Sequence, residues 1–85
     1  MAWQVRFVPN EVTSITVSCD GVHALDWSSA EGDVTKPVPA QWANLPHVHF
    51  VADGSPNGRN ASIKILWDGD ERHSMDFDNG EDWDS

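Results

Sequence analysis

The 85 residues of the chain form one domain, residues 1–85, because a chain this short buries only about 60% of its unfolded surface and cannot supply a second core. Fourteen acidic residues against five basic ones give a formal charge of -9. This balance argues against direct binding to nucleic acid or to an anionic membrane, since phosphate contacts need Lys and Arg.

The first third of the chain reads as strands. Apolar and polar residues alternate over residues 3–7 and again over residues 13–19, and residues 22–27 follow with a weaker alternation. A period of two with many β-branched side chains is typical of half-buried strands. Three strands are therefore expected here.

The link between the second and third strands can be predicted from the side-chain faces. A two-residue turn at 20–21 would put Leu25 and Trp27 on the face opposite to Ile15 and Val17. An odd loop or a bulge puts all four on one face, and burial of one face normally decides the register. We therefore expect an odd loop or a bulge.

The middle of the chain is rich in Pro, Gly, Ser and Thr. Within it, residues 39–45 are expected to form a short helix, because Pro39 suits the first helical position and Pro46 prevents continuation. Residues 47–52 then form a further strand, followed by a long turn.

The clearest hairpin lies near the C-terminal end. The apolar positions of two runs within residues 63–77 are all odd-numbered, which favours an odd loop of five residues between them. That register sets Ile65 opposite Met75 and Ile63 opposite Phe77, with all four side chains buried together.

The pattern as a whole predicts a mainly β fold. We expect five or six short antiparallel strands in a curved sheet or a small open barrel, with one short helix at residues 39–45. Residues 79–85 are expected to be an acidic tail that is free to move.

Metal and cofactor chemistry is not expected. His47 and His49 stand two apart on a predicted strand, a spacing that resembles the His-x-His of cupins, but the glutamate and glycines of that pattern are absent. Residues 76–82 lack the glycine and glutamate positions of an EF-hand loop. The sequence therefore predicts no metal site and no cofactor.

The sequence also predicts no enzyme, because no catalytic motif is present and Cys19 lies in a predicted strand where an inert buried thiol belongs. A lone cysteine forms no intramolecular disulfide, and no apolar stretch approaches the ~20 residues that cross a bilayer. A cytoplasmic location is expected.

The strongest functional signal is the acidity after residue 67, where eight of the fourteen acidic residues meet only one basic residue. Acidic side chains favour a basic partner protein. Tryptophan, which is frequent at binding hot spots, also occurs there between two aspartates. The predicted partner-binding residues are Asp68, Asp70, Glu71, Asp76, Asp78, Glu81, Asp82, Trp83 and Asp84.

In size, acidity and lack of motifs the chain resembles phage-encoded inhibitors of restriction, repair or CRISPR nucleases, a resemblance of overall character with no alignable motif. It implies a non-enzymatic protein that imitates DNA and blocks a basic surface, such as that of a nuclease. Two alternatives stay open: a small phage structural or assembly protein that works as an oligomer, and an immunity protein against a basic toxin. The sequence leaves the oligomeric state open.

Overall fold

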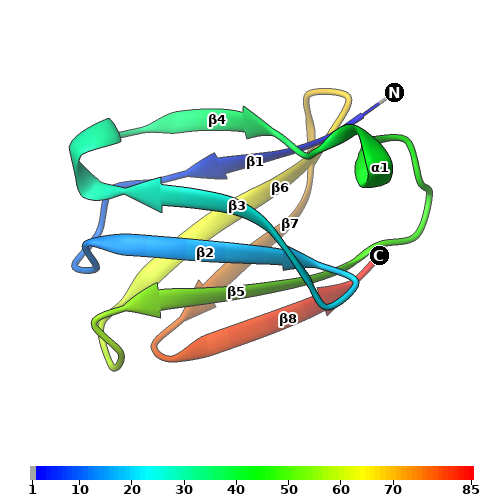
Figure 1. The fold of residues 1–85 in the computed structure, drawn as a ribbon. Coiled ribbons are helices and arrows are strands. Elements are labelled where there is room, and N and C mark those ends of the chain that lie inside the picture. The colour runs from blue at the N-terminus through cyan, green and yellow to red at the C-terminus, as the bar shows by residue number, and fades with distance from the viewer. Residues whose placement is uncertain (1) are drawn as a thin grey trace.

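A computed structural model describes residues 2–85 of the chain, and these residues form eight β-strands and two short helical turns (Figure 1). The alternating segments seen in the sequence account for most of the strands. The elements are β1 (Trp3–Phe7), β2 (Ser14–Cys19), β3 (Val22–Ser28), the 3-10 turn η1 (Ser29–Glu31), β4 (Val34–Pro37), α1 (Ala40–Ala43), β5 (His49–Ser55), β6 (Ala61–Trp67), β7 (Asp70–Phe77) and β8 (Gly80–Asp84).

The strands form two open, four-stranded antiparallel sheets that face each other (Figure 1). One sheet, called here the β1 sheet, has the order β4-β1-β6-β7. The other, the β2 sheet, has the order β3-β2-β5-β8. The prediction of a mainly β, antiparallel fold is confirmed. The residues described hold eight strands, however, where five or six were expected, because β4 and β8 are short edge strands with weak alternation.

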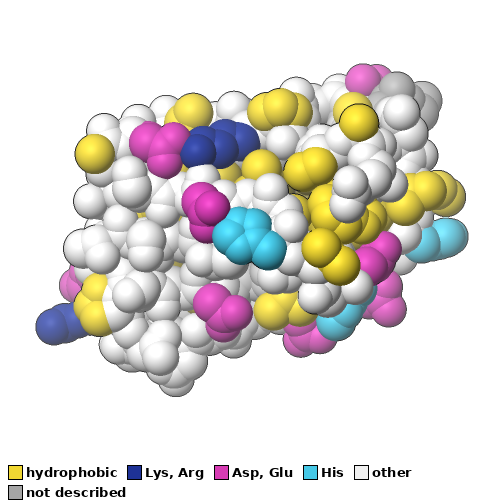
Figure 2. Space-filling model, viewed as in Figure 1, with side chains coloured by type: hydrophobic (Ala, Val, Ile, Leu, Met, Phe, Trp, Pro, Cys, Tyr) yellow, Lys and Arg dark blue, Asp and Glu magenta, His cyan; other side chains and the backbone are white. Residues whose placement is uncertain are grey.

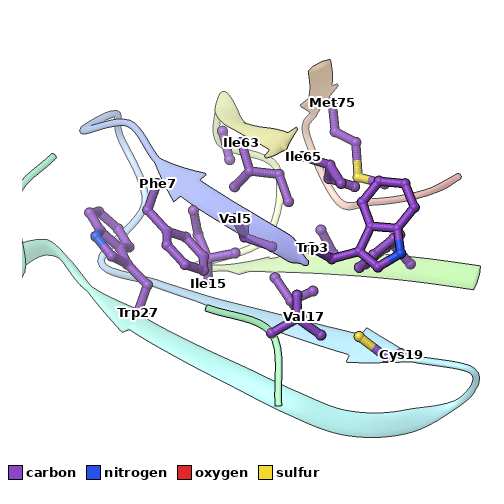
Figure 3. Packing of buried hydrophobic residues seen from close by; sticks show 14 of the residues in the cluster. Trp3, Val5, Phe7, Ile15, Val17, Cys19, Trp27, Ile63, Ile65 and Met75 are labelled. Carbon is purple, nitrogen blue, oxygen red and sulfur yellow. The ribbon is translucent and has the colours of Figure 1, made fainter. Parts of the chain in front are cut away.

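The core lies between the two sheets and is built from the inward-facing positions of both. Along β1 and β2 every second side chain is buried, and the side chains between them are half-buried. Trp3, Phe7, Ile15, Trp27 and Ile65 are among the residues that meet there (Figure 3). A strict period of two therefore sets which side of each strand becomes the interior.

Two of the buried tryptophans, Trp3 and Trp27, have hydrogen-bond partners for their indole N–H groups. Nε1 of Trp3 donates a hydrogen bond to the carbonyl oxygen of Leu45 at 2.6 Å, and Nε1 of Trp27 donates to that of Gly32 at 2.9 Å. Because an unpaired buried N–H would cost free energy, these bonds allow tryptophan to serve as core bulk here.

The β2–β3 hairpin contains the predicted bulge. Asp20 and Gly21 form a two-residue turn with positive φ angles of 52° and 82°, which pairs Cys19 with Val22. The register shifts between Ser18 and Val17, so that Val17 pairs with Leu25 and the apolar side chains of the two strands share one face. A two-residue turn alone would place the apolar side chains of β2 and β3 on opposite faces. The bulge adds one residue to β3 and so allows them to be buried on the same face.

The β6–β7 hairpin reaches the same solution and corrects the predicted loop. Ile63, Ile65, Met75 and Phe77 are buried together, as predicted. The connection is a two-residue turn with a bulge, however, and not a five-residue loop. Ile63 consequently pairs with Met75, and the predicted pairing of Ile65 with Met75 is off by two residues.

The helix α1 is shorter than the predicted span 39–45. It begins after Pro39 and ends at Ala43, and its side chains Trp42 and Ala43 are buried. One helical turn is too short to be stable alone, so the burial of Trp42 against the core is what holds it.

Candidate partner-binding surface

The predicted acidic residues follow two strands that lie against each other, β7 at one edge of the β1 sheet and β8 at one edge of the β2 sheet. The chain passes directly from β7 into β8 through residues 78–79, so the two edges meet on one side of the sandwich (Figure 1). We call residues 68–84 the β7–β8 edge. Its carboxylates are Asp68, Asp70, Glu71, Asp76, Asp78, Glu81, Asp82 and Asp84. They are strung along two contacting strands and do not form one compact cluster.

Most of these carboxylates form no ion pair within the described residues. Glu71 pairs with Lys64 at 3.3 Å, and Asp82 pairs with His49 at 2.8 Å. Within residues 2–85 the remaining six form no ion pair; they are Asp68, Asp70, Asp76, Asp78, Glu81 and Asp84. All but Glu81 are exposed.

The residues expected to form a mobile tail contain a strand. Gly80–Asp84 pairs with β5 along five positions, with Phe50 opposite Trp83 and Ala52 opposite Glu81. Since the inward face of β5 carries the buried Phe50 and Ala52, the side chains of Glu81 and Trp83 turn toward the sandwich interior. Asp82 and Asp84 turn outward.

Trp83, which the sequence suggests as a partner-binding residue, is half-buried and packs against the protein's own core. Its indole stacks on the ring of His73 at a centroid distance of 4.8 Å and packs near Phe50 and Trp3 at 6.1 and 6.0 Å. The β5–β8 register causes this burial, because it places Trp83 on the inward side of an edge strand. The stack with His73 joins β7 to β8 across the gap between the sheets.

His49 connects the outer face of β5 with the acidic residues of β8. Its Nε2 lies 2.8 Å from Oδ2 of Asp82, and its backbone N–H donates to Oδ1 of Asp20 at 2.9 Å. The hydrogen bond to Asp82, assisted by the negative charges of Asp82, Asp84 and Asp20, raises the pKa of His49 above 6.5. His49 therefore gains positive charge at a higher pH than a free imidazole does.

The two histidines weighed as metal ligands are engaged in different contacts. Nδ1 of His47 lies 3.0 Å from the carbonyl oxygen of Ser85, whereas His49 pairs with Asp82. In the described part of the chain, no group of three or more His, Cys, Asp or Glu side chains is arranged to hold a metal ion. Cys19 is fully buried, and burial raises the pKa of its thiol to about 11, so the thiolate is scarce at neutral pH.

An open depression of about 320 Å³ lies where β6 begins and β7 ends. Its lining combines residues with carboxylate, amide and hydroxyl side chains and two apolar residues that belong to the core. The lining residues are Asn10, Asn60, Ala61, Ser62, Asp76, Phe77 and Asp78. Of these, Asp76 and Asp78 were predicted as binding residues, and Phe77 between them was predicted as a core residue. The other four come from segments far away in the sequence, and no local motif marks them.

The basic residues are unevenly divided between the sheets. The strands of the β1 sheet carry four Lys or Arg residues, whereas the strands of the β2 sheet carry five acidic residues and no Lys or Arg. Figure 2 shows the β2 sheet toward the viewer, with Asp, Glu and His side chains spread across it and Lys or Arg only at its margins. The same view shows hydrophobic side chains gathered near α1. Among the residues described, the exposed large hydrophobic side chains are Val22 at the start of β3 and Leu45 shortly after α1, which are 52% and 42% exposed.

Comparison of the chain with protein-family models, curated proteins and solved structures finds no match. Among residues 2–85, no helix has the length and apolar character needed to pass through a lipid bilayer. Function has to be inferred from the residues of the β7–β8 edge themselves.

Proposed function

We propose that the protein is a non-enzymatic inhibitor that uses the β7–β8 edge to occupy a basic surface of another protein, one that otherwise binds nucleic acid. The observation that carries the proposal is the row of unpaired carboxylates along β7 and β8. The unpaired Asp84 and Asp82, whose partner is His49, stand two apart on one face of β8, which separates their side chains by about 7 Å in an extended strand. This spacing is similar to that of successive phosphates along a nucleic-acid strand.

A second feature supports the same function. The strands of the β2 sheet, on whose edge β8 lies, contain no Lys or Arg that would weaken the negative potential. A potential of one sign steers a basic partner toward the surface and repels nucleic acid. Both effects favour competition with DNA or RNA for the partner.

The experiment is displacement of DNA from defined basic proteins. A fluorescein-labelled DNA duplex is bound to each of a panel of purified basic nucleases, and its anisotropy is followed as the protein is added. The proposal expects that at least one nuclease loses its duplex, and that the inhibition weakens steeply with added salt because screening removes long-range attraction.

Matched variants locate the surface. Replacing Asp68, Asp70 and Asp84 by Asn should weaken inhibition about tenfold and flatten its salt dependence. The control replaces Glu11, Asp26 and Glu31 by their amides, which removes the same charge outside β7, β8 and the neighbouring β5 and should leave inhibition within about twofold. Equal losses in both variants, or inhibition that ignores salt, would overturn the proposal and favour an apolar, assembly-type interface.

A further inference from the structure

Three of the four histidines of the chain contact β8 or the residue that follows it. The contacts are His49 of β5 with Asp82 at 2.8 Å, His73 of β7 with Trp83 at a ring-centroid distance of 4.8 Å, and His47 with the carbonyl oxygen of Ser85 at 3.0 Å. Histidine is the side chain whose charge ordinarily changes near neutral pH. β8 is therefore bordered, from the side of β5 and from the side of β7, by side chains that can gain or lose a proton there.

Apart from these contacts, β8 is weakly attached. None of its five residues is fully buried, and as an edge strand of its sheet it pairs with β5 alone. Its inward positions hold Glu81 and Trp83, both half-buried, and Glu81 forms no ion pair within residues 2–85. An inward-pointing charge without an ionic partner weakens the attachment of an edge strand. Elements of this kind open locally far more often than the core unfolds.

The pair of His49 and Asp82 lies in negative surroundings. β8 contains three acidic residues and no Lys or Arg. The titratable side chains beside the pair and its strand, from the neighbouring elements, are Asp20 in the β2–β3 turn, His47 before β5, Asp53 on β5, His73 on β7 and Asp78 in the β7–β8 connection. A protonated His49 attracts the carboxylates around it, whereas a neutral His49 leaves them to repel one another. The charge of this imidazole therefore changes how strongly β8 is held.

We propose that β8 is a pH-sensitive edge strand, which protonated His49 holds on β5 in mild acid and which detaches more often as the pH rises through neutrality. The hydrogen bond to Asp82 and the surrounding negative charges raise the pKa of His49 above 6.5 in the folded protein. Detachment of β8 removes Asp82 from His49 and so removes the cause of the raised pKa. The pair therefore favours the attached strand fully below pH 6.5, and this contribution is lost as the pH rises through the folded value.

Detachment of β8 changes what the sandwich presents to its surroundings. The ring of Trp83 stacks on that of Phe50 at 6.1 Å, and Phe50 is fully buried. Without β8, the ring of Phe50 loses this cover and the hydrogen-bonding groups along the outer edge of β5 lose their partners. The pH thus shifts the balance between a sandwich with a covered β5 edge and one in which β5 is open to another strand.

Amide hydrogen exchange of the ¹⁵N-labelled full chain tests this behaviour. Protection factors of the β8 amides, corrected for intrinsic exchange rates, are measured by NMR from about pH 5.5 to about pH 8, a range above that in which ordinary carboxyl groups titrate. The β2 amides serve as the internal reference. We expect β8 protection to fall about threefold over this range, as suits an exposed ion pair, and β2 protection to change less. Protection of β8 that is constant, rises with pH, is absent throughout or falls in step with that of β2 would overturn the proposal.

Variants assign the pH dependence to one histidine. His49→Gln keeps a polar side chain that cannot be protonated, so it should remove most of the pH dependence of β8 protection. The matched control is His23→Gln, which should retain it, because His23 pairs with Asp26 of its own strand at 3.0 Å. Asp82→Asn should act like His49→Gln, and the double variant should add no further change. Full pH dependence in His49→Gln, or equal loss in both histidine variants, would overturn the proposal. No partner protein takes part, so the result is independent of the proposed inhibition.

Discussion

The two sheets share one core but differ in how their charges are balanced. In the β1 sheet, Arg6 binds Asp33 through two hydrogen bonds of 3.0 and 2.7 Å, and Lys64 pairs with Glu71. In the β2 sheet the only ion-pair partners of acidic side chains, in the residues described, are histidines, such as His49 beside Asp82. The ion pairs of the β1 sheet therefore use permanent cations, whereas those of the β2 sheet depend on the protonation of histidine.

This difference shows that the hydrophobic core and the surface charge are set by opposite faces of the same strands. Among the described residues of both sheets, no polar or charged side chain is buried, so both sheets follow the same folding rule. Outward positions differ in charge, and exposed charges contribute little to stability. The charges on the outer face of the β2 sheet can therefore change with little effect on the stability of the fold.

The largest expected effect comes from breaking the joint between the sheets. The ring of Trp3 on β1 lies 5.5 Å from Phe50 and 6.0 Å from Trp83, both in the β2 sheet. Trp3→Ala should lower the free energy of unfolding by about 3–5 kcal/mol, as large-to-small core changes do. Urea denaturation measures the loss. Trp3→Phe, which keeps an aromatic ring, should lose less, and equal losses would show that the ring contacts do not join the sheets.

A smaller effect is expected from the aromatic contact at the sandwich edge. Trp83→Ala removes the stack with His73 and should lower the free energy of unfolding by about 1–3 kcal/mol, because the side chain is only half-buried. Hydrogen exchange should show lost protection of the β8 amides, with Asp84→Asn as the control that preserves it. If the β8 amides exchange without protection in the wild-type protein, residues 79–85 form a mobile tail, as the sequence predicts.

The pH dependence of the β2 sheet follows from His49. Because its pKa is raised in the folded state, the pair contributes stability that is fully present below pH 6.5, the usual pKa, and is lost as the pH rises through the folded value. Asp82→Asn should lower the pKa of His49 and remove much of this dependence. NMR titration of the imidazole protons reads the pKa directly. Asp26→Asn, a charge-matched control, should leave it unchanged, and an unaltered pKa in Asp82→Asn would contradict the assignment.

The smallest effect is expected at the ion pair of the β1 sheet. Arg6 holds the pKa of Asp33 below its usual value, so the pair stabilises the fold above about pH 4 and its contribution is lost as the pH falls through the folded pKa. Arg6→Gln should slightly lower the urea midpoint at pH 7 and make no difference at strongly acid pH. A larger loss at acid pH would contradict this sign. Arg59→Gln is the control for simple loss of a positive charge.

The elements with strict alternation could be predicted from the sequence, and those that depend on tertiary pairing could not. β6 and β7 show their buried face in every second residue, so the hairpin was evident, but the local pattern does not distinguish a five-residue loop from a two-residue turn with a bulge. β4 ends in Pro37 and buries none of its residues fully. Its strand conformation therefore depends on its hydrogen-bonded pairing with β1.

The candidate site was predictable in composition but not in geometry. The count of carboxylates after residue 67 located the β7–β8 edge. The inward turn of Trp83 depends on its register with Phe50, and the depression around Asp76 depends on contact with Asn10 and Asn60. Such long-range neighbours leave no signal in a single sequence.

The order of the strands has a consequence for how the molecule assembles. Only the β2–β3 and β6–β7 hairpins stay within one sheet, and every other connection crosses from one sheet to the other. The chain therefore alternates between the two sheets. The β1 sheet is complete only when β7 has paired, and the β2 sheet only when β8 has paired. A nick in the loop 56–60 would leave β1 to β5 on one fragment and β6 to β8 on the other, each holding part of both sheets. Such halves should be unfolded when apart and should regain structure only when mixed.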